Sequence, residues 1–274
     1  MQVAGFNTQT YLYLNGVAVD RRIDLSNGIE LLPACPDCHM KLFIGLGKTD
    51  ADFSIISLFL PHVRAQLLVT GVNSEDSAKR AWNAIWDALL LGAVAGSEVI
   101  CNLHSDVSAE KLTPESTVLV TNYELRGFRE PKPLTEEQIA WIESNFSAAR
   151  ELLDVEPFRN AIHTLASYRW HSMPRAQLAL LWSAIEGLFT IESELVFRVS
   201  LYIAKFLHPG DLEQQRAAFS SVKKLYNFRS KAVHGGKIKG DFKQVVRESV
   251  DLLNLLVMRC VAERGLPKTE SLVP

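Results

Sequence analysis

The sequence has no apolar run that approaches the roughly 18 residues of a membrane-spanning helix. It starts MQVAGFNTQT, without the basic segment and apolar stretch of a secretory signal. Only 4 of its 274 residues are cysteine, and without an export signal this indicates a reducing cytosol rather than a disulfide framework. We therefore expect a cytoplasmic protein that has no membrane partner.

Familiar catalytic motifs are missing as well. The sequence contains neither the Gly-x-Ser-x-Gly elbow of hydrolases nor the His-Glu-x-x-His pair of zinc proteases. The segment from Gly45 to Thr49 resembles the end of a phosphate-binding loop, but Leu42 stands where that loop needs its first glycine, so we expect a turn. With 47% hydrophobic residues and a net charge of −2, the composition is that of an ordinary globular protein.

Strand signals dominate the first half of the chain. Asn15-Gly16, whose residues both tolerate positive φ, separates strand-like runs at 10–14 and 17–25 and predicts a β-hairpin. The apolar residues of 75–95 keep a helical period. Further strands are predicted at 53–60, 63–70, 98–103 and 117–125, and residues 41–45 are strand-like. Residues 1–130 are thus expected to form an α+β domain, mostly antiparallel sheet, whose role the sequence does not indicate.

The second half of the chain has the pattern of a helical bundle. Residues 126–133 contain two prolines and predict a linker. Thr135 and Gln138 then form a capping box, which marks a helix start. Amphipathic segments predict helices at 135–153, 157–170, 174–190, 195–207, 211–234 and 241–263. Their short connections favour an all-α bundle over residues 135–265.

Arg229 and His234 lie near the end of the fifth helix predicted in this bundle. Arginine binds a phosphate through two parallel hydrogen bonds, and histidine transfers protons near neutral pH. Five residues place the two side chains about 140° apart around a regular helix. They converge only where the last turn loosens or where two copies of the helix meet. The alternative is that His234, which precedes Gly235 and Gly236, merely ends the helix.

Positive charge gathers around this pair. Residues 223–247 contain eight basic residues and one acidic residue, a local charge of 8 − 1 = +7 in a chain of net charge −2. Such a patch is expected where a protein binds a polyanion. The lysines that we expect to contact RNA are Lys223, Lys224, Lys237 and Lys239, with Lys231 in support. The alternative is a solvated helix pair whose lysines face water.

The run LYNFRSKAVHGG at 225–236 resembles the signature of HEPN domains, most closely the Apea-like group linked to abortive phage infection. That family carries R-x(4–6)-H at the end of one helix of a helical bundle. Residues 178–189, which include Trp182, Ile185 and Glu186, are similar to an earlier helix of the family. The resemblance covers residues 135–265 and implies an all-α, HEPN-like bundle.

The resemblance also implies a chemistry. Many HEPN proteins are metal-independent endoribonucleases whose active site forms between two protomers, so it implies a homodimer through the bundle and no cofactor. Arg229 would stabilise the scissile phosphate and His234 would transfer protons, which leaves a 2′,3′-cyclic phosphate and a 5′-hydroxyl. Active members often have Asn, Asp or His after the arginine, where this chain has Ser230, which can still donate a hydrogen bond. A role in phage defence or toxin-like growth arrest follows from the resemblance alone.

Glu186 flanks an apolar helical stripe that we expect to face the bundle core. A carboxylate beside a core needs a partner. We expect that partner to be Arg229, whose guanidinium would then be fixed beside His234. A glutamate that faces solvent at the edge of the stripe is the alternative.

Two cysteine-containing pairs provide a weak metal-ligand pattern. Cys35 and Cys38 have the x2 spacing of zinc ligands, and so do Cys101 and His104. Together the four could complete a tetrahedral zinc site with a structural role. The alternative is that the cysteines are buried or incidental and the protein holds no metal.

Three functions are compatible with these patterns. The first is a metal-independent endoribonuclease of HEPN type. The second is a HEPN module that binds RNA or a nucleotide without cutting it, with Ser230 marking lost catalysis. The third is a dimeric scaffold in which Arg229 and His234 support the interface.

Overall fold

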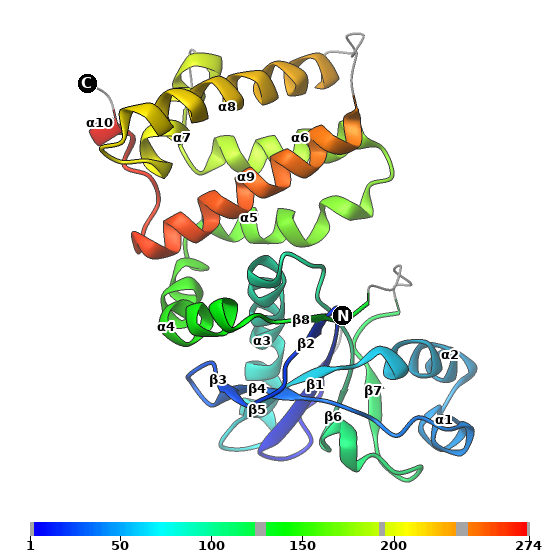
Figure 1. Ribbon diagram of the computed structural model, residues 1–274. Helices are drawn as coiled ribbons and strands as arrows, with labels where there is room; N and C mark the ends of the chain where they lie inside the picture. The colour runs from blue at the N-terminus through cyan, green and yellow to red at the C-terminus, as the bar shows by residue number, and fades with distance from the viewer. Residues whose placement is uncertain (1–2, 124–129, 192–194, 234–240, 273–274) are drawn as a thin grey trace. The chain divides into compact units, whose positions relative to one another are not determined.

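The computed structural model describes residues 3–123, 130–191, 195–233 and 241–272 (Figure 1). The chain divides into two compact units, Met1–Ser147 and Ala148–Pro274, and the division falls within helix α4 (Glu136–Leu152). Within the described residues, no helix has the length and apolar content to cross a membrane. An antiparallel sheet in the first unit and a helical bundle in the second confirm the predicted fold class, α+β followed by all-α.

Six strands of the first unit form one sheet in the order β3-β4-β5-β1-β6-β7, with every neighbouring pair antiparallel. Their bounds are β1 Gln9–Asn15, β3 Ile23–Asp24, β4 Ile29–Pro33, β5 Ala65–Thr70, β6 Ile100–Ser105 and β7 Val118–Val120. Two short strands, β2 (Val17–Ala18) and β8 (Lys132–Pro133), pair in parallel as a second sheet.

Helices cover both faces of the six-stranded sheet. Helix α3 (Ser74–Ala95) packs on β1, β5 and β6, and its Ser77 Oγ lies 2.8 Å from Thr10 Oγ1 of β1. Helices α1 (Met40–Leu46) and α2 (Asp50–Phe59) share a core with Tyr13 and Leu103, whose side chains project from the sheet. Because both faces are covered, the residues of β1 from Leu12 to Asn15 are all buried.

Three short 3-10 turns, η1 (Leu60–His62), η2 (Ala109–Lys111) and η3 (Tyr168–Trp170), connect the longer elements.

The predicted hairpin at Asn15-Gly16 is wrong. Strand β1 pairs with β5 and β6, whereas β2 pairs with β8, so these two residues carry the chain from one sheet to the other. Gly16 does have a positive φ of 92°, but it serves close packing: a Cβ there would lie 2.0 Å from the carbonyl oxygen of Glu98. The hairpin that does form joins β3 to β4, a strand that the sequence patterns missed.

The predicted strands at 41–45 and 53–60 are also wrong, because these residues form α1 and α2. Each helix has a side-chain cap: His39 Nδ1 accepts from Leu42 N at 3.1 Å, and Thr49 Oγ1 accepts from Asp52 N at 3.1 Å. Capping therefore outweighs the strand preference of the apolar residues that follow. The predicted helix at 75–95 and the strands near 63–70 and 98–103 are confirmed by α3, β5 and β6. Of the strand predicted at 117–125, only Val118–Val120 forms a strand, β7, and residues 124–125 lie outside the described residues.

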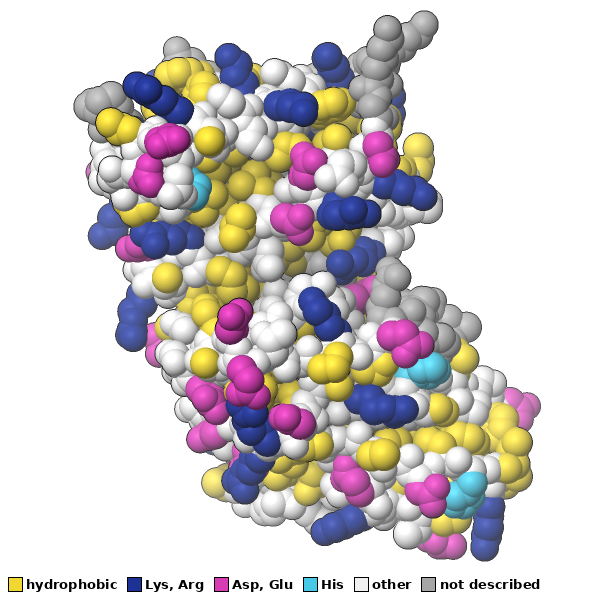
Figure 2. All heavy atoms as spheres, viewed as in Figure 1, with side chains coloured by type: hydrophobic (Ala, Val, Ile, Leu, Met, Phe, Trp, Pro, Cys, Tyr) yellow, Lys and Arg dark blue, Asp and Glu magenta, His cyan; other side chains and the backbone are white. Residues whose placement is uncertain are grey.

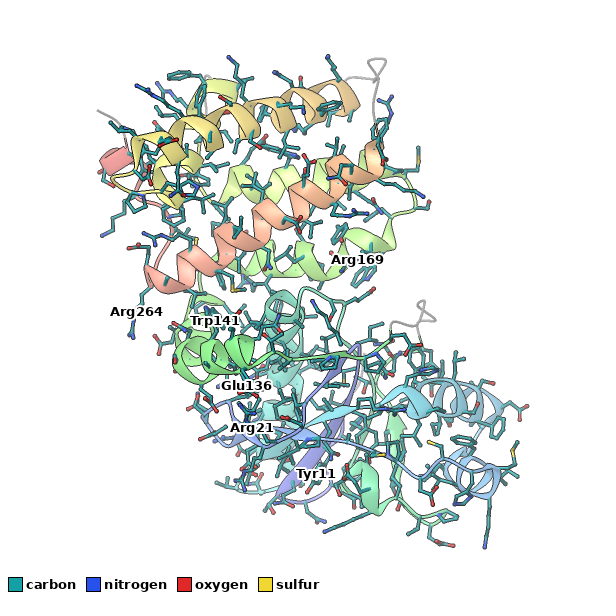
Figure 3. All side chains as sticks on the ribbon, viewed as in Figure 1. Tyr11, Arg21, Glu136, Trp141, Arg169 and Arg264 are labelled. Carbon is teal, nitrogen blue, oxygen red and sulfur yellow. The ribbon has the colours of Figure 1, made fainter. Side chains whose placement is uncertain are left out.

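Helix α4 begins at the capping box predicted from the sequence. Gln138 N donates to Thr135 Oγ1 at 3.3 Å, and Thr135 N donates to Gln138 Oε1 at 3.0 Å. Arg21 reaches the first turn of the same helix and donates to both carboxylate oxygens of Glu136, at 2.8 and 2.6 Å (Figure 3). Both side chains are exposed, so this pair contributes little stability despite its geometry. Of the linker predicted at 126–133, the structure describes only the part from Glu130, which ends in β8.

The second unit is a bundle in which helices α5 to α9 match the predicted ones to within a few residues, whereas α10 was not predicted. Their bounds are α5 Glu156–Ser167, α6 Pro174–Gly187, α7 Leu195–Leu207, α8 Leu212–Val233, α9 Phe242–Ala262 and the short α10 Thr269–Leu272. Helix α6 is central and packs on α5, α8 and α9. Its buried Trp182 donates from Nε1 to Ser249 Oγ of α9 at 3.2 Å, which satisfies the indole N–H inside the core.

Candidate functional site

Helix α8 places Arg229 against Glu186 of α6. Arg229 Nη2 donates to Glu186 Oε2 at 3.0 Å. The same nitrogen also lies 3.0 Å from Oε1, but only Oε2 accepts a hydrogen bond. The side chains of Arg229 and Glu186 are 18% and 19% exposed, so the pair is mostly but not wholly withdrawn from water. The predicted contact between Glu186 and Arg229 is confirmed, and a solvent-facing Glu186 is wrong.

The packing of α6 and α8 explains why these two side chains meet. Leu178, Leu181, Trp182 and Ile185 of α6 are buried, and Glu186 lies beside that stripe where α8 packs. Tyr226, about one turn before Arg229, packs edge-on against Trp182 with ring centroids 5.3 Å apart. The guanidinium carbon of Arg229 lies 5.3 Å from the centroid of the Tyr226 ring. The aromatic ring therefore supports the guanidinium, a contact that also favours a cation.

Burial dominates the electrostatics of this cluster. It raises the pKa of Glu186 above its ordinary 4.5, although the charge of Arg229 and a hydrogen bond with Tyr226 act in the opposite direction. Burial, followed by the negative charge of Glu186, also raises the pKa of Tyr226 above 10.0. The Tyr226 hydroxyl is therefore neutral at physiological pH, and the carboxylate is less well compensated than its short distance to Arg229 suggests.

The hydrogen-bonding capacity of the Arg229 guanidinium is not fully used within the described residues. Its Nε has no hydrogen-bond partner among the residues that the structure describes, although it is buried. Glu186 Oε1 is also buried and accepts no hydrogen bond in the described part of the chain, although Arg229 Nη2 lies 3.0 Å from it. An unpaired buried donor costs about 1–3 kcal/mol. The cluster is therefore not saturated, and an oxyanion or water that reached it would gain a hydrogen bond from the arginine.

Arg175 is a second arginine near the end of α8, and sequence reasoning missed it. Its Nη1 donates to the carbonyl oxygen of Ala232 at 2.7 Å, and its guanidinium carbon lies 5.6 Å from the ring centroid of Phe242, at the start of α9. It thus donates a hydrogen bond to a backbone carbonyl in the last turn of α8, where carbonyl groups lack partners within the helix. The one available signal was its place in the first turn of α6, where a helix disfavours a cation.

Three predicted site residues, His234, Lys237 and Lys239, lie outside the described residues. The description of α8 ends at Val233, one residue before His234. Ser230, next to Arg229, is half-buried, and Lys231 is exposed. The structure thus brings Arg229 together with Glu186 and Tyr226 and leaves the position of the histidine open.

The described lysines do not surround Arg229. Lys223, Lys224 and Lys231 lie between about 120° and 160° from Arg229 around the axis of α8, at 100° per residue. They line a hollow of about 370 Å³ on the outer side of the helix, which we call the α8 hollow. Its lining residues are Ser220, Lys223, Lys224, Asn227, Phe228 and Lys231. Figure 2 shows Lys and Arg side chains along the part of the helical unit where Figure 1 draws α8, with acidic side chains on the neighbouring surface. The basic surface is present, but it faces away from the Arg229–Glu186 pair.

The four zinc candidates do not come together. Among the described residues, which include all four, no group of three or more His, Cys, Asp or Glu side chains is placed to hold a metal ion. Cys101 is fully inside the first unit, where burial raises its thiol pKa to about 12. Cys35 is exposed, and burial raises the pKa of the half-buried Cys38.

His104 has a structural role in the sheet. Ala4 N donates to its Nε2 at 3.0 Å, and its Nδ1 lies 3.1 Å from Thr121 Oγ1. Burial lowers the pKa of this imidazole from 6.5 to about 4. His104 is therefore a neutral side chain whose nitrogens are already engaged.

We compared the chain with protein-family models, curated proteins and solved structures, and none of the three comparisons gave a match.

Proposed function

We propose that the helical unit is an endoribonuclease of the HEPN type that cuts RNA without a metal ion. The observation that carries this proposal is the fixed Arg229: a guanidinium held by Glu186 and Tyr226 in the last turns of α8, five residues before His234. The resemblance of LYNFRSKAVHGG and of the Glu186 helix to HEPN sequences supports the same assignment.

Each residue has a stated part in the chemistry. The 2′-oxygen of the ribose attacks the adjacent phosphorus, a new P–O2′ bond forms, and the P–O5′ bond breaks. One proton leaves the 2′-hydroxyl and one is added to the departing 5′-oxygen, so no water is consumed in this step. His234 transfers these protons, and Arg229 stabilises the negative charge that builds up on the phosphoryl oxygens. The products are a 2′,3′-cyclic phosphate and a 5′-hydroxyl.

Glu186 positions the arginine in this scheme. With Nη2 engaged by the carboxylate, the remaining N–H groups of the guanidinium are directed elsewhere and are oriented before substrate binds. Because the carboxylate also offsets part of the positive charge, its removal changes both the orientation of Arg229 and the local potential. Ser230 follows Arg229 and lies about 100° from it around α8.

We further propose that the active unit is a homodimer through the bundle, with one Arg229–His234 pair from each protomer. Two copies would supply one neutral imidazole as base and one protonated imidazole as acid for the two proton transfers. This arrangement meets the requirement set by helix geometry, since two side chains about 140° apart on one regular helix do not converge by themselves.

The test is cleavage of mixed RNA in the presence of EDTA. We expect the unaltered protein to cut, and both Arg229→Ala and His234→Ala to lose cutting by about 100-fold or more. Arg216→Ala is the matched control, because Arg216 is an exposed arginine on the same helix, and it is expected to keep full activity. Equal cutting by all four proteins would point to a contaminating nuclease and would remove the support for the proposal.

The second candidate is an RNA-binding module that does not cut, and the α8 hollow favours it. Three exposed lysines line this hollow, and Ser230 occupies a position that often carries Asn, Asp or His in active HEPN proteins. Salt-dependent RNA binding with no cleavage under any condition would select this alternative.

A further inference from the structure

The α8 hollow has a regular order of side chains along the helix. Lys224, Phe228 and Lys231 follow one another at spacings of four and three residues, so they form one row on a helical surface. Successive members are about 6 Å and about 4.5 Å apart along the axis, from a rise of 1.5 Å per residue. The two lysines are exposed, whereas Phe228 between them is half-buried. The row is therefore a cation, an aromatic ring and a second cation.

The charge around this row favours an anionic ligand. Residues 214–233 of α8 contain five basic residues and no acidic one. Lys223, which also lines the hollow, has its ammonium nitrogen 5.9 Å from the centroid of the Phe219 ring and forms no ion pair with the described residues. The lysines of the hollow thus keep charge that an anionic partner can neutralise.

We infer that the α8 hollow binds a single-stranded segment of RNA, with one base against the Phe228 ring and the flanking phosphates on Lys224 and Lys231. A base has two flat apolar faces and carries a phosphate on either side, which matches the order of the row. Asn227 lies in the same lining, and its amide can both donate to and accept from a base edge. Stacking on an aromatic ring between cationic side chains is a general mode of single-strand recognition.

Two other polyanions fit this surface less well. In duplex RNA the bases are already stacked on each other, so none is free to lie on Phe228. An anionic membrane would require large apolar side chains that project from the surface into the lipid. Phe228 is half-buried in a hollow, so it is placed to receive a flat ring rather than to insert.

The hollow acts apart from the cutting chemistry. Phe228 lies about 100° from Arg229 around α8, and Lys224 and Lys231 lie about 140° and 160° from it, so RNA bound in the hollow is held to one side of the Arg229–Glu186 pair. This inference deepens the proposed function, since it names the form of RNA that is recognised and the residues that hold it away from the scissile bond. It does not depend on cleavage, and binding is measured in a variant that cannot cut.

The experiment measures binding of a short fluorescent oligouridylate by anisotropy, with His234→Ala as the parent protein and EDTA present. Adding Phe228→Ala is expected to weaken binding about 5-fold or more. Phe228→Trp keeps a stacking surface and is expected to retain binding. Because Phe228 is half-buried, its loss could also affect folding, so circular dichroism is used to check that each variant is folded. The affinity falls as salt rises, with a slope of log affinity against log salt of about −0.7 per phosphate contact. Adding Lys224→Gln with Lys231→Gln removes two such contacts and is expected to make this slope less steep by about 1.4.

The matched charge control is Lys41→Gln with Lys48→Gln, two exposed lysines of the first unit, which are expected to leave the slope unchanged. Three results would overturn the inference: equal affinity for a duplex of the same length, an unchanged affinity after Phe228→Ala, or binding to phosphatidylserine vesicles that Phe228→Ala abolishes while RNA binding persists. If the oligouridylate binds as expected but the unaltered protein never cuts RNA, the nuclease proposal fails and this one stands.

Discussion

Replacing Glu186 by glutamine is expected to leave the stability of the helical unit nearly unchanged, whereas replacing Arg229 by glutamine lowers it. The two residues make one ion pair with a shortest N–O distance of 3.0 Å. Burial raises the pKa of Glu186 in spite of Arg229, so the ionised carboxylate costs more by desolvation than the pair returns. Glutamine has the shape of the protonated acid and avoids that cost. We therefore expect Glu186→Gln to change the free energy of unfolding by no more than about 0.5 kcal/mol.

Arg229→Gln removes the other partner and has the opposite consequence. It leaves Glu186 mostly buried beside Tyr226 without a cation and deletes a charge-assisted hydrogen bond, which contributes about 1.5–3 kcal/mol. Because both side chains keep some exposure, we expect the lower part of that range, about 1.5–2 kcal/mol. For a unit of this size the melting temperature would fall by roughly 5–10 °C.

The pH dependence gives the same prediction a second test. A carboxyl whose folded pKa lies above its unfolded value binds more protons in the folded state, so stability falls as pH rises from 4.5 through the raised pKa. Glu186→Gln should remove that fall. The destabilisation by Arg229→Gln should shrink as the pH approaches 4.5, because a protonated Glu186 needs no counter-charge.

The assay is urea denaturation followed by tryptophan fluorescence, with thermal melting beside it, at neutral pH and near the ordinary glutamate pKa. Arg216→Gln, an exposed arginine on the same helix, is the control and is expected to change stability by less than about 0.5 kcal/mol. The reasoning would be refuted if Glu186→Gln destabilised the protein as much as Arg229→Gln does. That result would mean that the carboxylate is a net stabilising group.

Three further predictions concern the stability of the two units. Burial lowers the pKa of His104 from 6.5 to about 4, so the free energy of unfolding of the first unit should fall by up to about 3 kcal/mol as pH falls between these values. His104→Gln should remove this pH dependence in urea denaturation, and an unchanged pH dependence would contradict the prediction. Gly16→Ala places a Cβ 2.0 Å from a backbone oxygen at a φ of +92°, and it should lower the free energy of unfolding by about 2 kcal/mol or more. Gly210→Ala, at a φ of +80° in open space, should lower it by only about 1 kcal/mol, and equal shifts in melting temperature would contradict this. Trp182→Phe loses the hydrogen bond to Ser249 and core volume and should cost about 1–3 kcal/mol by the same measurement, against nearly nothing for Trp170→Phe, which is 47% exposed already.

The helical half of the fold could be predicted well because its signals are local. Apolar residues recur at helical spacing over many turns, and caps such as the Thr135–Gln138 box mark where a helix begins. The sheet half was predicted less well because strand pairing is decided far along the chain. Gly16 illustrates this: its glycine is required by the Glu98 backbone, a contact across 82 residues, and not by a hairpin turn.

The candidate site was partly predictable for the same reason. Glu186 could be placed beside the core from the stripe on its own helix, and Arg229 was the cation expected near it, as the 3.0 Å contact confirms. The Arg175–Ala232 contact could not be foreseen, because it depends on where two helices of the bundle meet. Charge counting placed the lysines around Arg229, but counting along a chain ignores the direction of each side chain. Lys224 and Arg229 are neighbours in sequence and lie on different sides of α8.

The most direct test of the central claim is end-group analysis of RNA fragments produced in EDTA. We expect fragments from the unaltered protein to end in a 2′,3′-cyclic phosphate and to begin with a 5′-hydroxyl, and we expect none from Arg229→Ala or His234→Ala. RNA that the unaltered protein binds but leaves intact, or the same fragments from either variant, would contradict the account.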